Sequence, residues 1–184
     1  QNSVYKRDFY FYIGLIISLL PYMYLQSNVR FPADAVWLYQ AAEHFWHGQK
    51  LSEYYFDTNP PMCFLVYLPI VWLKEFGMNL WAAMNIYTTA LIVIALGSTH
   101  YFLKFWDISD LQHYLIIALS AFGLTLITIL GFGQKDHLIG IALLPFSLAQ
   151  LSITYNHPLN KAFRTLSFIL WVPFILIKPH YGII

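Results

Sequence analysis

The side chains best suited to chemistry lie in one polar stretch, residues 31–62, which separates two apolar segments. The stretch reads FPADAVWLYQAAEHFWHGQKLSEYYFDTNPPM and contains four of the nine acidic residues. Asp34 precedes a run in which apolar and aromatic residues recur at helical spacing, which predicts an amphipathic helix lying in a membrane interface. A carboxylate in a partly dry pocket is a suitable general base for a hydroxyl group. The alternative is that Asp34 is only the N-cap of that helix.

Asp57 is the second candidate in this stretch. It is followed by Thr58, Asn59 and two prolines at 60–61, so it could orient substrate hydroxyl groups or a metal ion. The same pattern is typical of an Asx turn that leads into a helix beginning at the prolines. Both interpretations remain open at the level of sequence.

Two further polar groups interrupt apolar sequence. The segment GFGQKDHLIG contains Gln134, Lys135, Asp136 and His137, and WVPFILIKPH ends on Lys178 and His180. Cations beside apolar spans are costly unless they meet an anion, so these residues are candidates for binding a substrate, with a lipid phosphate as the natural anion for Lys178. The alternative for both groups is a set of side chains that snorkel to the membrane surface.

Other chemistries have little support. No HExxH motif, DxD pair or other dense ligand set occurs, so no metal site is predicted and dependence on a divalent metal stays open. The net charge of +1 is scattered, which argues against nucleic acid as a partner. The single cysteine, Cys63, cannot form an internal disulfide and is interpreted as an apolar filler.

The composition indicates an integral membrane protein. Of the 184 residues, 59% are hydrophobic and only 10% are charged, against roughly 25% charged in soluble domains. Several windows approach the ~20 apolar residues that cross a bilayer, where helices satisfy every backbone polar group. We therefore predict an all-α, polytopic transmembrane helical bundle, with an amphipathic interfacial helix in the first external loop, residues 27–60.

The apolar windows predict the order of the spans. Full crossings are expected at the following ranges: 9–25, 61–73, 80–105, 138–155 and 166–177. Basic residues before the first span and between the last two place those ends in the cytoplasm by the positive-inside tendency. The number of crossings agrees with these two assignments only if residues 111–132 form a re-entrant hairpin, broken near Gly123, that does not cross the membrane. The first loop, 134–137 and 178–180 then lie on one external face.

The first loop resembles that of the GT-C glycosyltransferases. The resemblance is carried by an ordered set of residues, and GQKDH resembles a Gln-Arg-Glu-His motif in a subset of bacterial members. The ordered residues are Asp34, Tyr39, Ala41, Ala42, Gly48, Tyr55, Asp57, Pro60 and Pro61. Ala35 follows Asp34 where the aminoarabinose and O-mannosyl branches have glutamate.

The resemblance implies a function for the chain. It implies transfer of a sugar from a polyprenyl-phosphate carrier to an acceptor hydroxyl, with inversion, with Asp34 as general base and no certain cofactor. Residues 1–184 would form one module, expected to be the N-terminal part of a longer protein in a bacterial inner membrane, with its active face in the periplasm. Its partners would be membrane lipid, the lipid-linked sugar and a further membrane protein or segment. The alternatives are a non-catalytic scaffold and a transport subunit for lipid-linked sugar.

Overall fold

The computed structural model describes residues 8–9, 11, 13–15, 17, 19, 22, 24, 30–50, 53, 60–127, 129–155 and 160–178. All regular structure in these ranges is helical, and they contain no strand. The predicted all-α class is therefore confirmed for the described part of the chain. Two predicted site residues, Asp57 and His180, lie outside it.

Three short helices form one group: α2 (Ala33–Trp46), α4 (Met62–Leu65) and α5 (Leu68–Glu75). Prolines start them, because a proline at a helix start has no amide hydrogen to leave unpaired. The buried face of α2 is apolar and packs on α4 and α5, so protein covers it rather than lipid. The buried residues of α2 are Ala35, Leu38, Tyr39, Ala41 and Ala42.

The predicted span at 61–73 is wrong in this structure. Its residues form α4, with 4 residues, and α5, with 8 residues. A helix of 8 residues is about 12 Å long, well short of the ~30 Å of a bilayer core. The segment is apolar because it packs against α2, α6 and α9 and not because it crosses.

Three helices in the described part of the chain are long and apolar enough to cross a membrane. They are α6 (Leu80–Leu103), α7 (Asp110–Phe122) with its π-helical continuation η1 (Gly123–Ile127), and α8 (Lys135–Thr154). A short 3₁₀ turn, η2 (Ile129–Gly131), precedes α8. The shorter α9 (Lys161–Ile175) returns along α8.

Side-chain caps mark where several of these helices begin. Asn79 accepts a hydrogen bond from the backbone of Ala82 at the start of α6, and Asn160 does the same for α9. Ser109 and Gln112 form a capping box at the start of α7. These polar caps satisfy amides that have no partner within the helix.

The predicted re-entrant hairpin at 111–132 is also wrong. Gly123 has helical torsions, with φ −62° and ψ −45°, and the helix passes through it as a π segment. A glycine permits a break but does not impose one. Residues 110–127 therefore form one helix of 18 residues that is long enough to cross.

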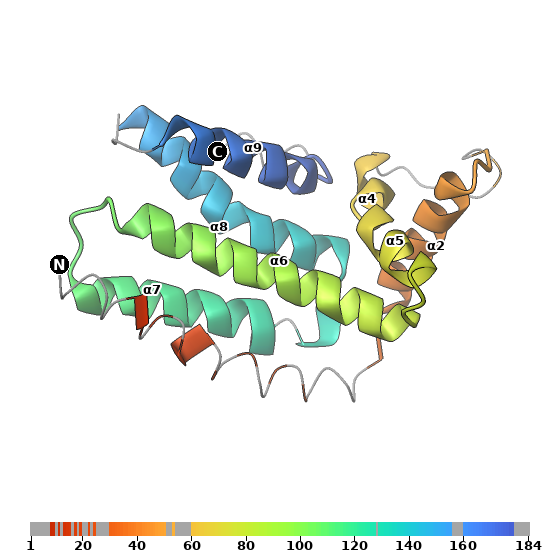
Figure 1. Cartoon of the computed structure of the whole chain (residues 1–184), viewed down its shortest axis with the longest axis horizontal. Coiled ribbons are helices and arrows are strands. Elements are labelled where there is room, and N and C mark those ends of the chain that lie inside the picture. Colours follow the sequence, from red (N-terminus) through yellow and green to blue (C-terminus); the bar gives the residue numbers. More distant parts are fainter. Residues whose placement is uncertain are drawn as a thin grey trace.

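The long helices run back and forth between two ends of the molecule (Figure 1). We call one the α2 end; it holds α2, α4, α5, the start of α8 and residues 176–178 after α9. The other is the His100 end; there the end of α6 meets the start of α7 through a hydrogen bond between His100 and His113. Figure 1 shows α2, α4 and α5 grouped at one end of α6.

The two topology errors cancel. Losing the long helix expected at 61–73 and gaining a long helix at 110–127 leaves residues 31–50, 133–137 and 178 at the same α2 end. Ion pairs between these segments show that they meet there. The predicted proximity of the three polar segments is thus confirmed, although by a different path of the chain.

Candidate functional site

Asp34 is the second residue of α2 and is not its cap. The N-cap is Pro32, whose carbonyl accepts from the backbone amides of Ala35 and Val36, and no side chain caps this helix. The carboxylate of Asp34 is therefore not consumed by the helix amides, as the N-cap alternative required. An acid in the first helical turn also interacts favourably with the helix dipole.

Lys135 brings a cation to Asp34 from a distant part of the sequence. Its ammonium nitrogen lies 3.8 Å from Asp34 Oδ2, which is beyond hydrogen-bond distance. The Lys135 side chain is 18% exposed and that of Asp34 is 40% exposed. Among the described residues this is the only ion pair of Asp34, so the carboxylate has room for a second partner.

A second ion pair adjoins the first. Lys178, just after α9, donates to Asp136 Oδ1 at 2.5 Å. Because Asp136 follows Lys135 in the first turn of α8, the two pairs form one group of alternating charge. We call Asp34, Lys135, Asp136 and Lys178 the charge cluster; α2, α8 and the residues after α9 each contribute to it.

Tyr67 supports the turn that precedes Lys135 of the charge cluster. The sequence did not predict Tyr67 as a functional residue. Tyr67 lies in the turn between α4 and α5, is fully buried, and donates to the Gly133 carbonyl at 2.6 Å. Burial, followed by the negative charge of Asp34, raises the pKa of the Tyr67 hydroxyl well above its usual value. Tyr67 therefore stays protonated as a hydrogen-bond donor. Nothing in its local sequence distinguishes it from the other tyrosines.

Gly133 connects Tyr67 to His137. Its φ of 72° is in the left-handed region that favours glycine. Its carbonyl accepts from Tyr67, and its amide donates to His137 Nδ1 at 3.1 Å. The sequence signal for this turn is the GFG of GFGQK, which places glycine on both sides of Phe132.

His137 was predicted to bind substrate, but the fold engages both of its ring nitrogens. Nδ1 accepts from Gly133, which leaves the proton on Nε2, and Nε2 lies 2.9 Å from the carbonyl of Leu124 in the π segment. The side chain is buried. We interpret His137 as the link that fastens the start of α8 to η1, beneath the charge cluster.

Gln134 is the N-cap of α8, but its side chain makes no capping hydrogen bond. Its backbone amide donates to the Gly131 carbonyl. The side chain is half-buried beside the charge cluster, next to Lys135. Its predicted role in binding substrate therefore stays a prediction.

An aromatic wall stands beside Asp34. Phe31 lies one turn before it and packs on Trp81 at a centroid distance of 4.4 Å and on Phe132 at 5.8 Å. Gly133 borders the same wall, because a Cβ there would lie 3.9 Å from Phe31. Such rings can pack against the apolar face of a sugar or the first isoprene units of a lipid.

A separate polar group holds α2 on α5. Glu43 accepts from Lys74 and from the Tyr39 hydroxyl, both at 2.6 Å. Burial opposes ionisation of Glu43, but these two donors outweigh it and lower its pKa. The hydrogen bond to Glu43 raises the pKa of Lys74, and burial raises that of Tyr39 to about 12. This group fixes the helix that carries Asp34.

Two apolar grooves are found among the described residues. One, of about 550 Å³, lies between α4, α5, α6 and α9, and its lining includes Phe174, four residues before Lys178. The other, of about 640 Å³, lies between α7 and the helical residues near the N-terminus. Neither lining includes Asp34, so neither groove is the partly dry pocket expected around a general base at this position.

The charge cluster and the neighbouring aromatic wall together supply groups that a transfer from a phosphate needs: a partly exposed carboxylate, two cations and apolar rings. The described residues contain no group of three or more His, Cys, Asp or Glu side chains suited to a metal ion. Comparison of the chain with known protein families, with curated proteins and with solved structures finds no match.

Proposed function

We propose that the chain is a membrane-embedded glycosyltransferase module of the GT-C kind. It would transfer a sugar from a polyprenyl-phosphate carrier to an acceptor hydroxyl at the α2 end. The observation that carries the proposal is the 3.8 Å distance between Lys135 Nζ and Asp34 Oδ2. It places a cation beside a carboxylate that can still accept a further hydrogen bond. The sequence resemblance of the first loop supplies the reaction class.

In the proposed membrane arrangement, α6, α7 with η1, α8 and α9 cross the bilayer, and the α2 end faces the periplasm. The hydropathy and length of α6, α7 with η1, and α8 support this arrangement. Exposed aromatic side chains at the α2 end suit the headgroup level of the bilayer. These are Phe45, Trp46, Trp72, Phe76 and Trp81.

The reaction would proceed by displacement at the anomeric carbon. Asp34 accepts the proton of the acceptor hydroxyl, whose oxygen forms the new bond to that carbon. The bond between the carbon and the phosphate oxygen breaks, and the electron pair leaves with the polyprenyl phosphate. Lys135 and Lys178 would stabilise the charge that develops on the phosphate, which is where a fixed cation lowers the barrier most.

Lys178 must partly release Asp136 to reach the phosphate. Its pair with Asp136 is short, but the Asp136 side chain is 59% exposed, so water can replace the lysine at modest cost. The 550 Å³ groove, whose lining includes Phe174, four residues before Lys178, would hold the first isoprene units. Lys178 would then meet the phosphate of the bound carrier.

The test is a transfer assay with the whole chain in lipid nanodiscs. Undecaprenyl-phosphate-linked sugars, including hexose and aminosugar donors, are offered with lipid and oligosaccharide acceptors, and release of undecaprenyl phosphate is measured. We expect release with at least one donor and loss of release in Asp34→Asn. Absence of release with every donor, or equal release by wild type and Asp34→Asn, would refute the catalytic proposal.

A second candidate is a lipid-phosphate-binding subunit without catalysis. The specific observation in its favour is that Asp34 lines neither apolar groove. In that case no transfer is detected, undecaprenyl phosphate binds to the nanodisc protein, Lys178→Gln weakens the binding, and Asp34→Asn leaves the binding unchanged. Binding measured by native mass spectrometry distinguishes the two functions.

A further inference from the structure

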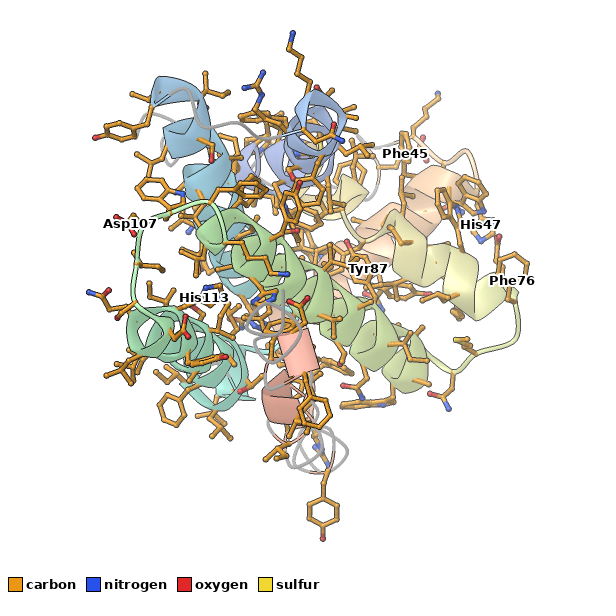
Figure 2. All side chains as sticks on the ribbon, turned by 60° about the vertical axis from the view of Figure 1, so that its left-hand side comes forward. Phe45, His47, Phe76, Tyr87, Asp107 and His113 are labelled. Carbon is orange, nitrogen blue, oxygen red and sulfur yellow. The ribbon has the colours of Figure 1, made fainter. Side chains whose placement is uncertain are left out.

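A second set of ionisable side chains lies at the His100 end, away from the charge cluster. His113 on α7 hydrogen-bonds to His100 on α6 at 2.9 Å, through Nε2 and Nδ1 respectively. The other ring nitrogen of His100 lies 2.9 Å from Asp8 Oδ1, and Lys104 lies 2.5 Å from the same oxygen. Figure 2 shows His113 on the side of Asp107, away from Phe45 of α2 and from His47, which follows that helix.

This set connects the surface to the interior. His113 is 1% exposed and His100 is 5% exposed, whereas the Asp8 side chain is 33% exposed. Two buried imidazoles beside an apolar helix are costly, and in membrane proteins such residues commonly mark proton pathways. A proton can pass from solvent to Asp8, then to His100 and His113, along hydrogen bonds that already exist.

The hydrogen bonds limit how many protons the two imidazoles can hold. With Asp8 ionised, His100 Nε2 carries a proton, and the link between the rings contains one proton more. One added proton preserves that link, whichever ring then carries the positive charge, because one of the two facing nitrogens still accepts a hydrogen bond. A second added proton would make both facing nitrogens donors and set two cations side by side. The pair therefore takes up one proton and no more while it remains intact.

The charge of Asp8 favours that uptake. Its hydrogen bond from Lys104, despite the opposing effect of burial, holds the pKa of Asp8 below its usual value, so Asp8 is ionised at neutral pH. A carboxylate at hydrogen-bond distance stabilises an imidazolium, whereas burial and Lys104 oppose it. The other ionisable groups nearby are Asp107, Asp110 and Tyr114, together with those of α8 and α9 at this end.

The groups from α8 and α9 reach this end through aromatic contacts. Tyr155 packs on Trp106, and Phe163 packs on Tyr101. Among the described residues, Tyr155, Lys161 and Arg164 are the titratable or charged groups that α8 and α9 bring to this end, and Tyr101 of α6 lies beside them.

We propose that Asp8, His100 and His113 form a single-proton site, and that proton uptake strengthens attachment of the N-terminal helical residues to α6 and α7. Phe11 supports the coupling, because its ring stacks on His100 at 4.1 Å. Phe11, Gly14 and Leu15 also line the 640 Å³ groove opposite α7. The protonation state of the pair thereby sets how firmly one wall of that groove is held.

The site is tested first by titration. Histidines labelled with ¹⁵N are followed by NMR in nanodiscs that contain the whole chain. We expect His100 and His113 to share one proton uptake between about pH 5 and 8. Asp8→Asn should lower the proton affinity roughly tenfold, and Lys104→Gln should raise it by a similar factor. His47→Gln, at an exposed histidine just after α2, is the matched control and should change nothing.

The coupling is tested by hydrogen exchange of residues 8–24, corrected for the intrinsic pH dependence of exchange. In wild type, protection should rise several-fold as pH falls through the uptake measured by NMR, and this rise should be absent in Asp8→Asn. Two independent uptakes, no uptake between pH 5 and 8, or protection that ignores pH would each overturn the proposal. Equal titrations in wild type, Asp8→Asn and Lys104→Gln would also overturn it.

Discussion

Asp34 and Lys135 lie 3.8 Å apart although α2 and α8 are separated by α4, α5, α6 and α7 in the chain. The carboxylate is held by the first turn of α2 and the ammonium by the first turn of α8. Neither group is a helix cap. The packing of the two helix starts therefore creates a pair of charges with capacity for a third, substrate partner.

Asp34→Asn should abolish most transfer without unfolding the protein. Asparagine retains the shape of the side chain but cannot accept the proton, so we expect a loss of about 10²-fold or more in kcat. Because Asp34 is not the N-cap, the free energy of unfolding should change by less than about 1 kcal/mol. Asp107→Asn, the same substitution in an exposed loop at the His100 end, is the control and should retain full activity.

Substitutions of Lys135 and of Lys178 should have different effects on the kinetics of transfer. Lys135→Gln removes the cation nearest Asp34 and should lower kcat/KM about 10²-fold, because charge develops on the phosphate in the transition state. Lys178→Arg should retain most activity and Lys178→Gln should not. Steady-state kinetics with undecaprenyl-phosphate-linked sugar check this. If Lys178→Gln behaves as wild type, Lys178 serves only its ion pair with Asp136.

The stability of the protein should be sensitive to small substitutions in and around the turn at 131–134. Tyr67→Phe leaves the buried Gly133 carbonyl without its donor and should cost about 1–3 kcal/mol. Gly133→Ala forces an L residue to a φ of 72° and should cost about 1–2 kcal/mol. Gly97→Ala is the matched control. It lies within α6 with no atom near a new Cβ, so it should be neutral or stabilising.

These changes are read as thermal unfolding midpoints in detergent, followed by circular dichroism. A Gly133→Ala midpoint equal to that of Gly97→Ala would show that the turn at 131–134 is not constrained as described. Loss of stability in Tyr67→Phe without loss in Gly133→Ala would confine the effect to the hydroxyl.

The contribution of Glu43 to stability should depend on pH. Its pKa is lowered in the folded state, so the stabilisation is present above its unfolded pKa of about 4.3 and is lost as pH falls through the folded value. The pKa of Lys74 is raised, so its contribution is complete below about 10.4 and is lost at higher pH. Stabilisation by the pair is therefore greatest between these limits.

The effect should be small, because Lys74 is 43% exposed and solvent screens the pair. We expect Glu43→Gln to cost about 0.5 kcal/mol at pH 7 and nothing below about pH 3. Unfolding of wild type and Glu43→Gln across pH 3–9 checks this. A difference that grows on acidification would contradict the assigned direction.

The proposed membrane arrangement predicts which residues share a side. Single cysteines at Lys50 and Lys135 should react with a membrane-impermeant maleimide from one side, and those at Asp107 and Lys161 from the other. Each single cysteine is introduced into a Cys63→Ala background, which removes the one native cysteine. Labelling of Asp107 from the same side as Lys50 would restore the re-entrant topology that the helix at 110–127 replaces.

The sequence by itself determined the helical class, most of the apolar segments and the polar groups around Asp34, Lys135 and Lys178. These follow from local properties, because hydropathy and helix-starting residues act within a few turns. Asp34 can be identified in the same way, because it lies in a polar stretch between two apolar segments. Tyr67 cannot be identified from the sequence, because its importance depends on a hydrogen bond to a distant backbone carbonyl.

Only the tertiary structure decided which apolar segments are long helices and which charges meet. Residues 61–73 are apolar because α2 and α9 cover them, and an apolar run buried by protein has the same local pattern as one exposed to lipid. The glycine at 123 permitted a break that packing did not impose. Likewise the pairs Asp34 with Lys135 and Lys178 with Asp136 depend on how α8 packs against its neighbours. Such contacts join residues far apart in the chain, and local sequence carries no record of them.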